Sequence, residues 1–297
     1  MSSTRAPAWV FIVLVIGICC SALSFVFIRE SAERSIMLAA WRVLLSALFL
    51  LPAYCLARQK YGDESIGKVF LRSFIPGVIL SLHFIAWVAG ARLTPAANAT
   101  LIVNLMPLVM PFLMYFMYQE KLQKHELWAT GLAMAGLVLL SINDISISRE
   151  HFIGDVLCFV SMLLFAAYLS LARKKLNAVA SLWLYLVPMY LVAGLCSFII
   201  AAATGPVMPT MTPYNITMVV MLAAVSTVIG HSALNLAMQK MRGQTVTLMN
   251  LLQFVIAGLV GYKLYKEVPS TLFYIASAMM ICALLVVILK SSTKAKS

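Results

Sequence analysis

The chain has 297 residues, of which 63% are hydrophobic and only 11% are charged, with a mean hydropathy of +0.97. Soluble domains carry roughly 25% charged residues. Almost every window of about 20 residues is apolar, the length that crosses a bilayer as a helix. This composition excludes a water-soluble core and indicates a polytopic membrane protein.

The formal charge of +12 would suggest nucleic acid or acidic partners in a soluble protein. Here the basic residues lie in the connections between apolar runs. With ten spans and the N-terminus inside, fifteen Lys and Arg residues fall on the cytoplasmic side and six on the other. This bias predicts a multi-pass membrane protein with both termini cytoplasmic, and no nucleic-acid partner.

The apolar runs predict an all-α fold of ten transmembrane helices with short connections and no extramembrane domain. The first run is interpreted as a retained span, because about 20 residues is long for the apolar region of a signal peptide. The predicted spans are 9–28, 36–57, 73–92, 95–118, 125–142, 154–172, 179–203, 214–238, 244–264 and 269–289.

The six cysteines all fall inside apolar runs, without CxxC or Cys/His spacing. We therefore expect neither a disulfide framework nor a metal site.

Polar residues recur at nearly one offset, which predicts two repeats, 9–143 and 152–290. Glu120 and Glu267 are 147 residues apart, and His83 and His231 are 148 apart. Asn104 and Asn250 are 146 apart. Five spans in each half is an odd number, so the second half must enter the membrane from the opposite side. The predicted architecture is a pair of inverted five-helix repeats.

Three segments carry a family resemblance. They are Ala-Arg-Leu-Thr-Pro-Ala-Ala-Asn-Ala-Thr-Leu-Ile-Val-Asn-Leu-Met-Pro (91–107), Tyr-Gln-Glu-Lys-Leu (118–122) and Gly-Leu-Ala-Met-Ala-Gly (131–136). Together they resemble the EamA repeat of the drug/metabolite transporter superfamily, and the resemblance covers nearly the whole chain as two copies. It implies a ten-span inner-membrane carrier, commonly an exporter of amino acids or related small metabolites, and leaves the substrate open.

The family pattern places a helix-breaking proline in the fourth span, which ends at a Gly-Glu-Arg-like turn. Pro107 and Glu120 match it, with Gln119 in place of the usual glycine. The second copy departs further. Phe254 stands where the proline would fall, and Val268 where a basic residue is common.

Arg42 is the only full charge well inside a predicted span, and Trp41 is next to it. A charge at this depth is costly and should face protein or water. One interpretation is a side chain that reaches back to lipid head groups. The other is an anion clamp for a carboxylate or phosphate, because guanidinium pairs with both through two hydrogen bonds.

His83 and Trp87 lie four residues apart on one helix face, and His231 and Asn235 repeat that spacing on the eighth span. Polar groups in hydrocarbon need partners, so both faces should point into the bundle. They form interhelical hydrogen bonds or line a substrate cavity. If transport is coupled to protons, the histidines are the natural titrating groups.

Asn104, Pro107 and Pro111 share one stripe of the fourth span, and Asn250 and Gln253 form the matching stripe of the ninth. Proline removes a backbone donor and frees a carbonyl. The freed carbonyl and the side-chain amides of these stripes either bind substrate or have a structural role, in a helix kink stabilised by amide packing.

Glu120 and Glu267 end their helices, where the helix dipole disfavours a carboxylate. We expect a neighbouring lysine or a loop amide to hold each one, as a gate or a loop cap. Tyr168, Trp183 and Tyr185 either line the cavity or, the favoured interpretation, serve as belt or packing residues.

There is no Walker A loop and no HExxH or GxSxG stretch, so the sequence predicts neither a cofactor nor an enzyme. The leading hypothesis is a secondary transporter that exports small polar or zwitterionic metabolites such as amino acids by alternating access, with membrane lipids around it. The alternatives are a lipid-linked carrier or flippase subunit and, from another class, an intramembrane enzyme or sensor. The oligomeric state is left open.

Overall fold

The structure is a computed structural model that describes residues 7–62, 64–94, 96–141, 149–207, 210, 212–266 and 268–293. Every regular element in these ranges is a helix, so the predicted all-α class is confirmed. The helices are α1 (Ala8–Ala22), α2 (Ser24–Glu30), α3 (Ser35–Tyr61), α4 (Ile66–Leu93), α5 (Ala96–Val103), α6 (Met106–Tyr118), α7 (Lys124–Ser141), α8 (Arg149–Leu176), α9 (Leu182–Thr204), α10 (Pro213–Met221), η1 (Leu222–His231), α11 (Ser232–Lys240), α12 (Gly243–Asn250), α13 (Leu252–Tyr265) and α14 (Thr271–Thr293).

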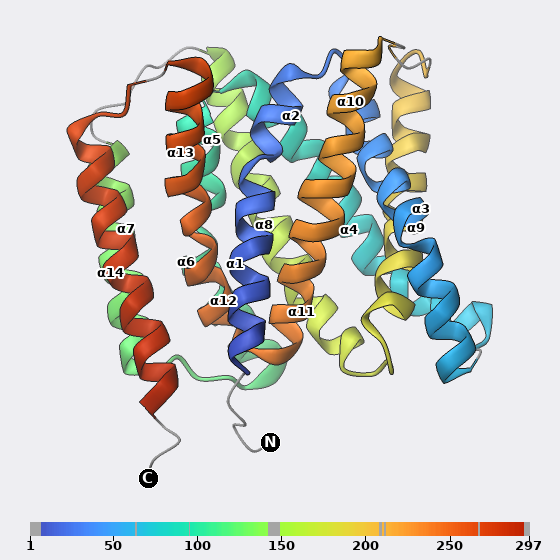
Figure 1. Ribbon diagram of the computed structural model, residues 1–297, viewed down its shortest axis with the longest axis horizontal. Coiled ribbons are helices and arrows are strands. Elements are labelled where there is room, and N and C mark those ends of the chain that lie inside the picture. Colours follow the sequence, from blue (N-terminus) through green and yellow to red (C-terminus); the bar gives the residue numbers. More distant parts are fainter. Residues whose placement is uncertain are drawn as a thin grey trace.

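These helices form ten spans, numbered here in chain order. Span 1 is α1 with α2, span 4 is α5 with α6, span 8 is α10 with η1 and α11, and span 9 is α12 with α13. Nine helical stretches in the described ranges are long and apolar enough to cross a bilayer. The tenth span is α7, which begins with the polar Lys124-His125-Glu126 and packs along α14 (Figure 1).

The two halves repeat the same helix boundaries, as the polar offsets predicted. Four pairs of helices begin 147 residues apart, and the left-handed residues after α6 and α13, Gln119 (φ 54°) and Lys266 (φ 57°), are also 147 apart. The paired starts are Ser35 and Leu182, Ile66 and Pro213, Ala96 and Gly243, and Lys124 and Thr271.

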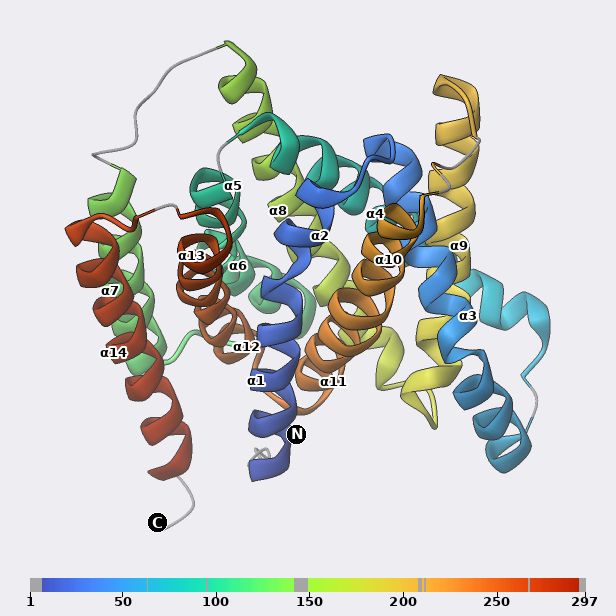
Figure 2. The same cartoon turned by 45° about the horizontal axis from the view of Figure 1, so that its top comes forward.

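Along the bundle, each span lies in one layer with its counterpart in the other half (Figures 1 and 2). The order is spans 5 and 10, 4 and 9, 1 and 6, 3 and 8, and 2 and 7. The two spans of a layer pack directly against each other in the layers of spans 5 and 10, 4 and 9, and 2 and 7. Contacts between layers also come in symmetric sets, since span 1 packs on span 8 as span 6 packs on span 3. Span 1 begins and span 10 ends at the same edge of the bundle, which we call the terminus side.

Spans 4 and 9 are both interrupted near their middle. Span 4 breaks at Asn104 and Leu105, ahead of Pro107. Span 9 breaks at Leu251 although it lacks the proline, through a tight turn in which the Leu251 amide donates to the Leu248 carbonyl (3.2 Å). Two features were not predicted: span 1 is interrupted at Leu23, and span 8 contains a π-helix, η1.

Glycine brings span 1 close to span 8. A Cβ added to Gly17 would lie 2.3 Å from the Cβ of Ala233 and 3.2 Å from the Gly230 carbonyl oxygen. No rotation of a side chain relieves such a contact, because alanine has none to rotate. The close approach of these helices therefore depends on Gly17.

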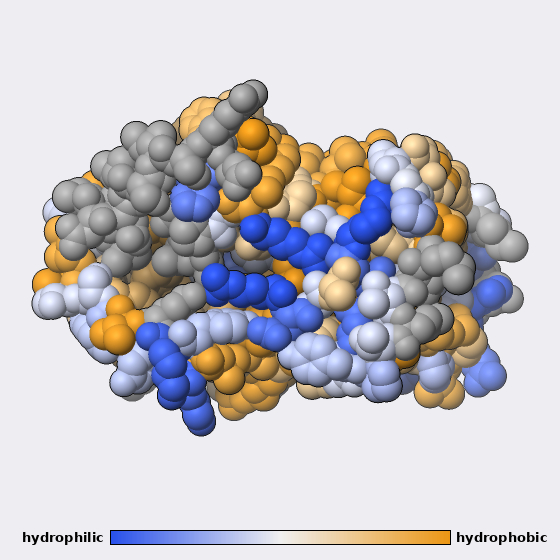
Figure 3. Space-filling model, turned by 90° about the horizontal axis from the view of Figure 1, so that it is seen from above, coloured by the Kyte–Doolittle hydropathy of each residue, from blue (hydrophilic) through white to orange (hydrophobic). Residues whose placement is uncertain are grey.

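The sides of the bundle expose large apolar side chains such as Leu71, Phe116 and Trp128, which suits contact with lipid. Figure 3 views the side opposite to the termini and shows hydrophilic residues gathered across the middle of that face, with apolar residues around them. The polar ends and apolar sides are those of a membrane-spanning bundle.

We expect Gly17→Ala to lower the melting temperature of the detergent-purified protein, because overpacking a tight helix contact costs about 1–3 kcal/mol. Gly131→Ala is the matched control, since a Cβ there meets nothing within 4 Å and alanine favours the helix. Equal melting temperatures for the two variants would contradict the close packing of spans 1 and 8.

Candidate functional site

Arg42 lies in the second turn of α3 with 1% of its surface exposed. Its Nε donates to the Thr227 hydroxyl (2.7 Å) and a terminal nitrogen donates to the Ser24 hydroxyl (3.4 Å). The guanidinium carbon lies 4.0 Å from the centre of the Phe84 ring. The side chain therefore points into the bundle, toward spans 1, 3 and 8. The alternative interpretation, a side chain reaching to head groups, is wrong.

The π-helix η1 positions the groups of span 8 that face Arg42. Thr227 lies within this segment. Its hydroxyl donates to the Leu222 carbonyl five residues earlier (3.2 Å) and accepts from Arg42. His231 ends the same segment. Short π-helical insertions occur often at functional sites, because they change the direction in which side chains point.

The two histidines meet across spans 3 and 8, with ring centres 6.2 Å apart. His83 Nδ1 lies 2.9 Å from both the carbonyl oxygen and the hydroxyl oxygen of Ser161 on span 6. The Phe165 ring stacks on His83 at 4.6 Å and lies 5.3 Å from His231. Phe84 lies 4.9 Å from His231 and joins the pair to Arg42.

Asn235 and Trp87 complete this central cluster. The Asn235 amide donates to the Tyr168 hydroxyl and to the His231 carbonyl (2.8 Å), and the Trp87 indole donates to Ser24 (3.5 Å). The structure thus brings Arg42, His83, Trp87, His231 and Asn235 together. Trp41 lies apart, with its ring edge against Phe198.

Several buried polar atoms in and around the central cluster have no hydrogen-bond partner among the described residues. They include His231 Nδ1, Asn235 Oδ1, the Tyr185 hydroxyl and the Trp41 indole nitrogen. Buried polar atoms are almost always paired, and an unpaired one costs free energy. Water or a polar solute would satisfy them.

The predicted stripe of spans 4 and 9 forms a second group, where the two interrupted helices cross. Asn104 and Asn250 are fully buried at the two breaks, and Gln253 is half-buried one turn further along α13. Asn104 Oδ1 and both amide atoms of Asn250 lack a partner within the described ranges. The layer of spans 1 and 6 lies between this crossing and the layer of Arg42 (Figure 1).

The carbonyl of Pro107 explains part of the proline pattern. Pro111 has no N–H to donate to it, and Gln244 of span 9 donates instead, from Nε2 at 3.0 Å. The same nitrogen donates to the Thr130 hydroxyl (2.7 Å). The freed carbonyl thus joins the two repeats, and its contact with substrate stays a prediction.

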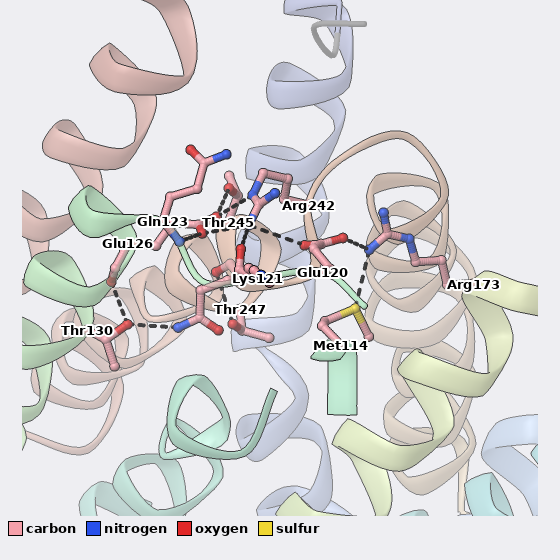
Figure 4. A network of polar contacts seen from close by, with 11 residues as sticks. Met114, Glu120, Lys121, Gln123, Glu126, Thr130, Arg173, Arg242, Thr245 and Thr247 are labelled. Carbon is pink, nitrogen blue, oxygen red and sulfur yellow. Dashed lines mark hydrogen bonds and ion pairs between the residues drawn. The ribbon is translucent and has the colours of Figure 1, made fainter. Parts of the chain in front are cut away.

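Glu120 lies in a chain of charges at the terminus side, shown in Figure 4. Its carboxylate pairs with Arg173 at 2.8 Å and lies 3.7 Å from Arg242. The predicted local partner, a lysine or loop amide, is wrong, because both arginines come from the second repeat. Arg173 also lies over the Tyr118 ring, with its guanidinium carbon 5.2 Å from the ring centre.

Glu126 continues the chain and its side chain is completely buried. Arg242 binds both carboxylate oxygens, from Nε at 2.7 Å and a terminal nitrogen at 2.9 Å, and also donates to the Lys121 carbonyl (2.7 Å). Burial alone would lower the pKa of Arg242, but the hydrogen bond with Glu126 and the charges of Glu126 and Glu120 outweigh it and raise the pKa. Arg173, Glu120, Arg242 and Glu126 are named the terminus-side latch below.

The opposite side has its own cluster. Glu30 accepts from the hydroxyls of Tyr214 (2.7 Å) and Tyr265 (3.0 Å), and the Arg29 guanidinium carbon lies 4.9 Å from the centre of the Tyr265 ring. Glu267, predicted to act here as a gate or loop cap, lies outside the described residues.

Comparison with known proteins gives the family. The sequence pattern of the EamA-like transporter family matches residues 8–142 and again residues 152–289. The chain belongs to the EamA-like transporter family. Its members are transporters, which agrees with the predicted non-enzyme.

The fold of this EamA-like transporter is also found among solved structures. One, described only as a crystal structure of a protein, matches 97% of this chain and 98% of its own with a TM-score of 0.76 and 16% sequence identity. At that identity it supports the fold alone. A comparison with curated protein sequences finds no match.

Sequence reasoning missed several residues of this transporter. Tyr168 and Tyr185, interpreted as belt or packing residues, are fully buried beside the central cluster. The sequence analysis also gives no role to three residues of the latch. Arg173 and Arg242 count there only among the basic residues of the connections, and Glu126 is not singled out. Only Glu126 carried a usable signal, as a carboxylate two residues inside the start of an apolar helix.

We expect Thr227→Val to destabilise the transporter by about 1–3 kcal/mol, because a buried guanidinium donor loses its acceptor. Thr217→Val is the matched control, since Thr217 is exposed on the same span and its hydroxyl donates to the Pro213 carbonyl. Thermal unfolding in detergent measures both. Equal loss in the two variants would show that the bond between Thr227 and Arg42 does not hold the charge in place.

Proposed function

We propose that this EamA-like protein is a secondary transporter that exports small polar or zwitterionic metabolites, with amino acids as the leading class, by alternating access. Arg42 would bind the anionic group of the solute. The observation that carries the proposal is a fully buried guanidinium whose described partners are two hydroxyls and an aromatic ring.

The distribution of acids supports an external counter-ion. All ten Asp and Glu residues of the sequence lie in connections or within a few residues of a span end. Among the described residues none of them pairs with Arg42. A buried charge in a membrane protein is costly unless it is paired, so a carboxylate-bearing solute would relieve that cost.

The hydrogen-bonding capacity of the guanidinium also supports this role. The bonds to Thr227 and Ser24 engage two of its five N–H donors and fix its plane against Phe84. A carboxylate takes two parallel N–H donors from such a fork. The amide of Asn235 and the ring of His231 would supply neutral hydrogen bonds to the rest of the solute.

The inverted repeats support alternating access, because exchanging the conformations of the two halves converts one open side into the other. The charge itself is not repeated. The residue 147 positions after Arg42 is Met189, whereas His83 and His231 keep the repeat. A single anion-binding group between two symmetric halves would serve a solute with one anionic end. Glu120 would act as a gate residue at the terminus side.

Solute counterflow in proteoliposomes tests the function. We expect exchange of labelled amino acids or related zwitterions by the unmodified protein and at least about a tenfold loss in Arg42→Gln, as expected from one lost charge-assisted pair. Arg72→Gln is the control, because Arg72 pairs with Glu64 at the surface. Folded protein that exchanges no amino acid, amine, nucleoside or carboxylate would refute the proposal and favour the lipid-linked alternative.

The proposed orientation places the terminus side in the cytoplasm, supported by the fifteen basic residues assigned to it by sequence. In a protein whose native cysteines are replaced, Asn177→Cys should react with an impermeant thiol reagent only in inside-out vesicles. Val207→Cys, at the other side, should react only in right-side-out vesicles. The reverse pattern would place the termini outside.

A further inference from the structure

We propose that the ion pair between Arg242 and Glu126, two residues without a charged counterpart 147 positions away, biases the transporter toward the conformation that is closed at the terminus side. This inference rests on the proposed alternating access. It concerns the regulation of access to the central cluster rather than the identity of the solute.

The terminus-side latch joins both repeats. Glu120 follows the end of span 4 and Glu126 lies in the first turn of span 5, whereas Arg173 lies in the last turn of span 6 and Arg242 precedes span 9 (Figure 4). The described ion pairs are 2.7–3.7 Å long and form one continuous series from Arg173 to Glu126. An opening that moves spans 4 and 5 away from spans 6 and 9 at this side separates these pairs.

Glu126 is the most strongly held member of the latch. Besides Arg242, its carboxylate accepts from the Gln123 amide (2.9 Å) and lies 3.4 Å from the Thr245 hydroxyl. The Glu126 side chain is fully buried and the Arg242 side chain is 32% exposed, so the pair is partly buried. Separation of a partly buried pair is more costly than separation of a fully exposed one.

Part of the latch is repeated at the opposite side. Arg173 lies over the ring of Tyr118, and Arg29 lies over the ring of Tyr265, 147 residues after Tyr118. Both tyrosines are the last residues of their spans. An arginine on a span-ending tyrosine is therefore common to the two sides.

The link between Arg242 and Glu126 is not repeated. Spans 5 and 10 begin 147 residues apart, so Phe273 occupies the position of Glu126, and Pro95 is the counterpart of Arg242 in sequence. Proline and phenylalanine carry no charge. Phe273 instead packs against Phe254, with ring centres 5.1 Å apart, and a Cβ on Gly258 would lie 2.2 Å from its ring.

This difference sets a direction. Exchanging the conformations of the repeats exchanges the closures at the two sides. At the opposite side the buried Glu33 carboxylate accepts from the uncharged Asn215 of the second repeat (2.9 Å), and the positions that correspond to Arg242 and Glu126 hold the uncharged Pro95 and Phe273. A contact present in one of two states shifts their populations by its own free energy. The pair therefore favours the state closed at the terminus side, which faces the opposite side when empty.

Two buried reporters can measure this bias in a protein whose native cysteines are replaced. Ser170→Cys lies behind the latch, where the Tyr118 hydroxyl donates to the Ser170 carbonyl (2.5 Å). Phe25→Cys lies behind the opposite cluster, with the Phe25 ring 6.3 Å from that of Tyr265. An impermeant thiol reagent applied from each side reads the opening of that side.

We expect Glu126→Gln to increase the labelling rate of Ser170→Cys from the terminus side by at least about fivefold, and to slow the labelling of Phe25→Cys from the other side. Glu64→Gln is the control, because Glu64 forms an exposed pair with Arg72 within one repeat. Faster labelling at Ser170→Cys without slower labelling at Phe25→Cys would mean local loosening and would overturn the proposal. No change at either reporter would overturn it as well.

Arg242→Gln and the double variant keep the test valid if Glu126→Gln folds poorly. If the two residues act as one pair, the double variant should label no faster than either single variant. Additive effects would contradict a shared link. A labelling shift without solute counterflow would refute the proposed function alone, and counterflow with no labelling shift would refute the bias alone.

Discussion

The fold depends on holding one positive charge inside an apolar bundle. Arg42 is tolerable there because four spans contribute to its surroundings: Ser24 from span 1, Phe84 from span 3, Thr227 from span 8 and its own span 2. None of these groups is an acid. The hydroxyls and the ring position the guanidinium without neutralising its charge, which is the reason for proposing an anionic solute as its partner.

The internal repeat accounts for the positions of the helices, and the residues that differ between the two copies carry the proposed function. Helix starts recur at 147 residues, and the histidines face each other across paired spans. The charged residues that the repeat does not keep include Arg42, which corresponds to Met189, Glu126, which corresponds to Phe273, and Arg242, which corresponds to a proline. In the proposed alternating-access transporter, the symmetric residues would form the scaffold that the two states share. The unrepeated charges would distinguish the anionic end of a solute, and one side of the membrane from the other.

Sequence patterns predicted the spans, the repeat and the inward faces of His83 and His231, because hydrophobic length and residue offsets are local properties of the chain. They did not predict the π-helix, because its residue types carry no signal for it. The contacts of Thr227 with Leu222 and Arg42 are seen only in the structure. They also assigned Glu120 a local partner. Its arginines lie 53 and 122 positions away, and only the packing of span 6 against span 4, and of span 9 beside span 5, brings them together.

The two polar groups of the interior have different consequences for motion. The central cluster is shared by spans 1, 2, 3, 6 and 8, and its hydrogen bonds connect the halves through single contacts such as that of Arg42 with Thr227. The crossing of spans 4 and 9 contains unpaired amides and interrupted helices, and an interrupted helix bends at less cost than a continuous one. The latch acts on the ends of these same spans. If the ion pairs of Glu120 and Arg242 separate, spans 4 and 9 would therefore bend at their interruptions and move relative to spans 1 and 6. Spans 1 and 6 border the central cluster, so this bending would connect the closure of one side to the site of Arg42.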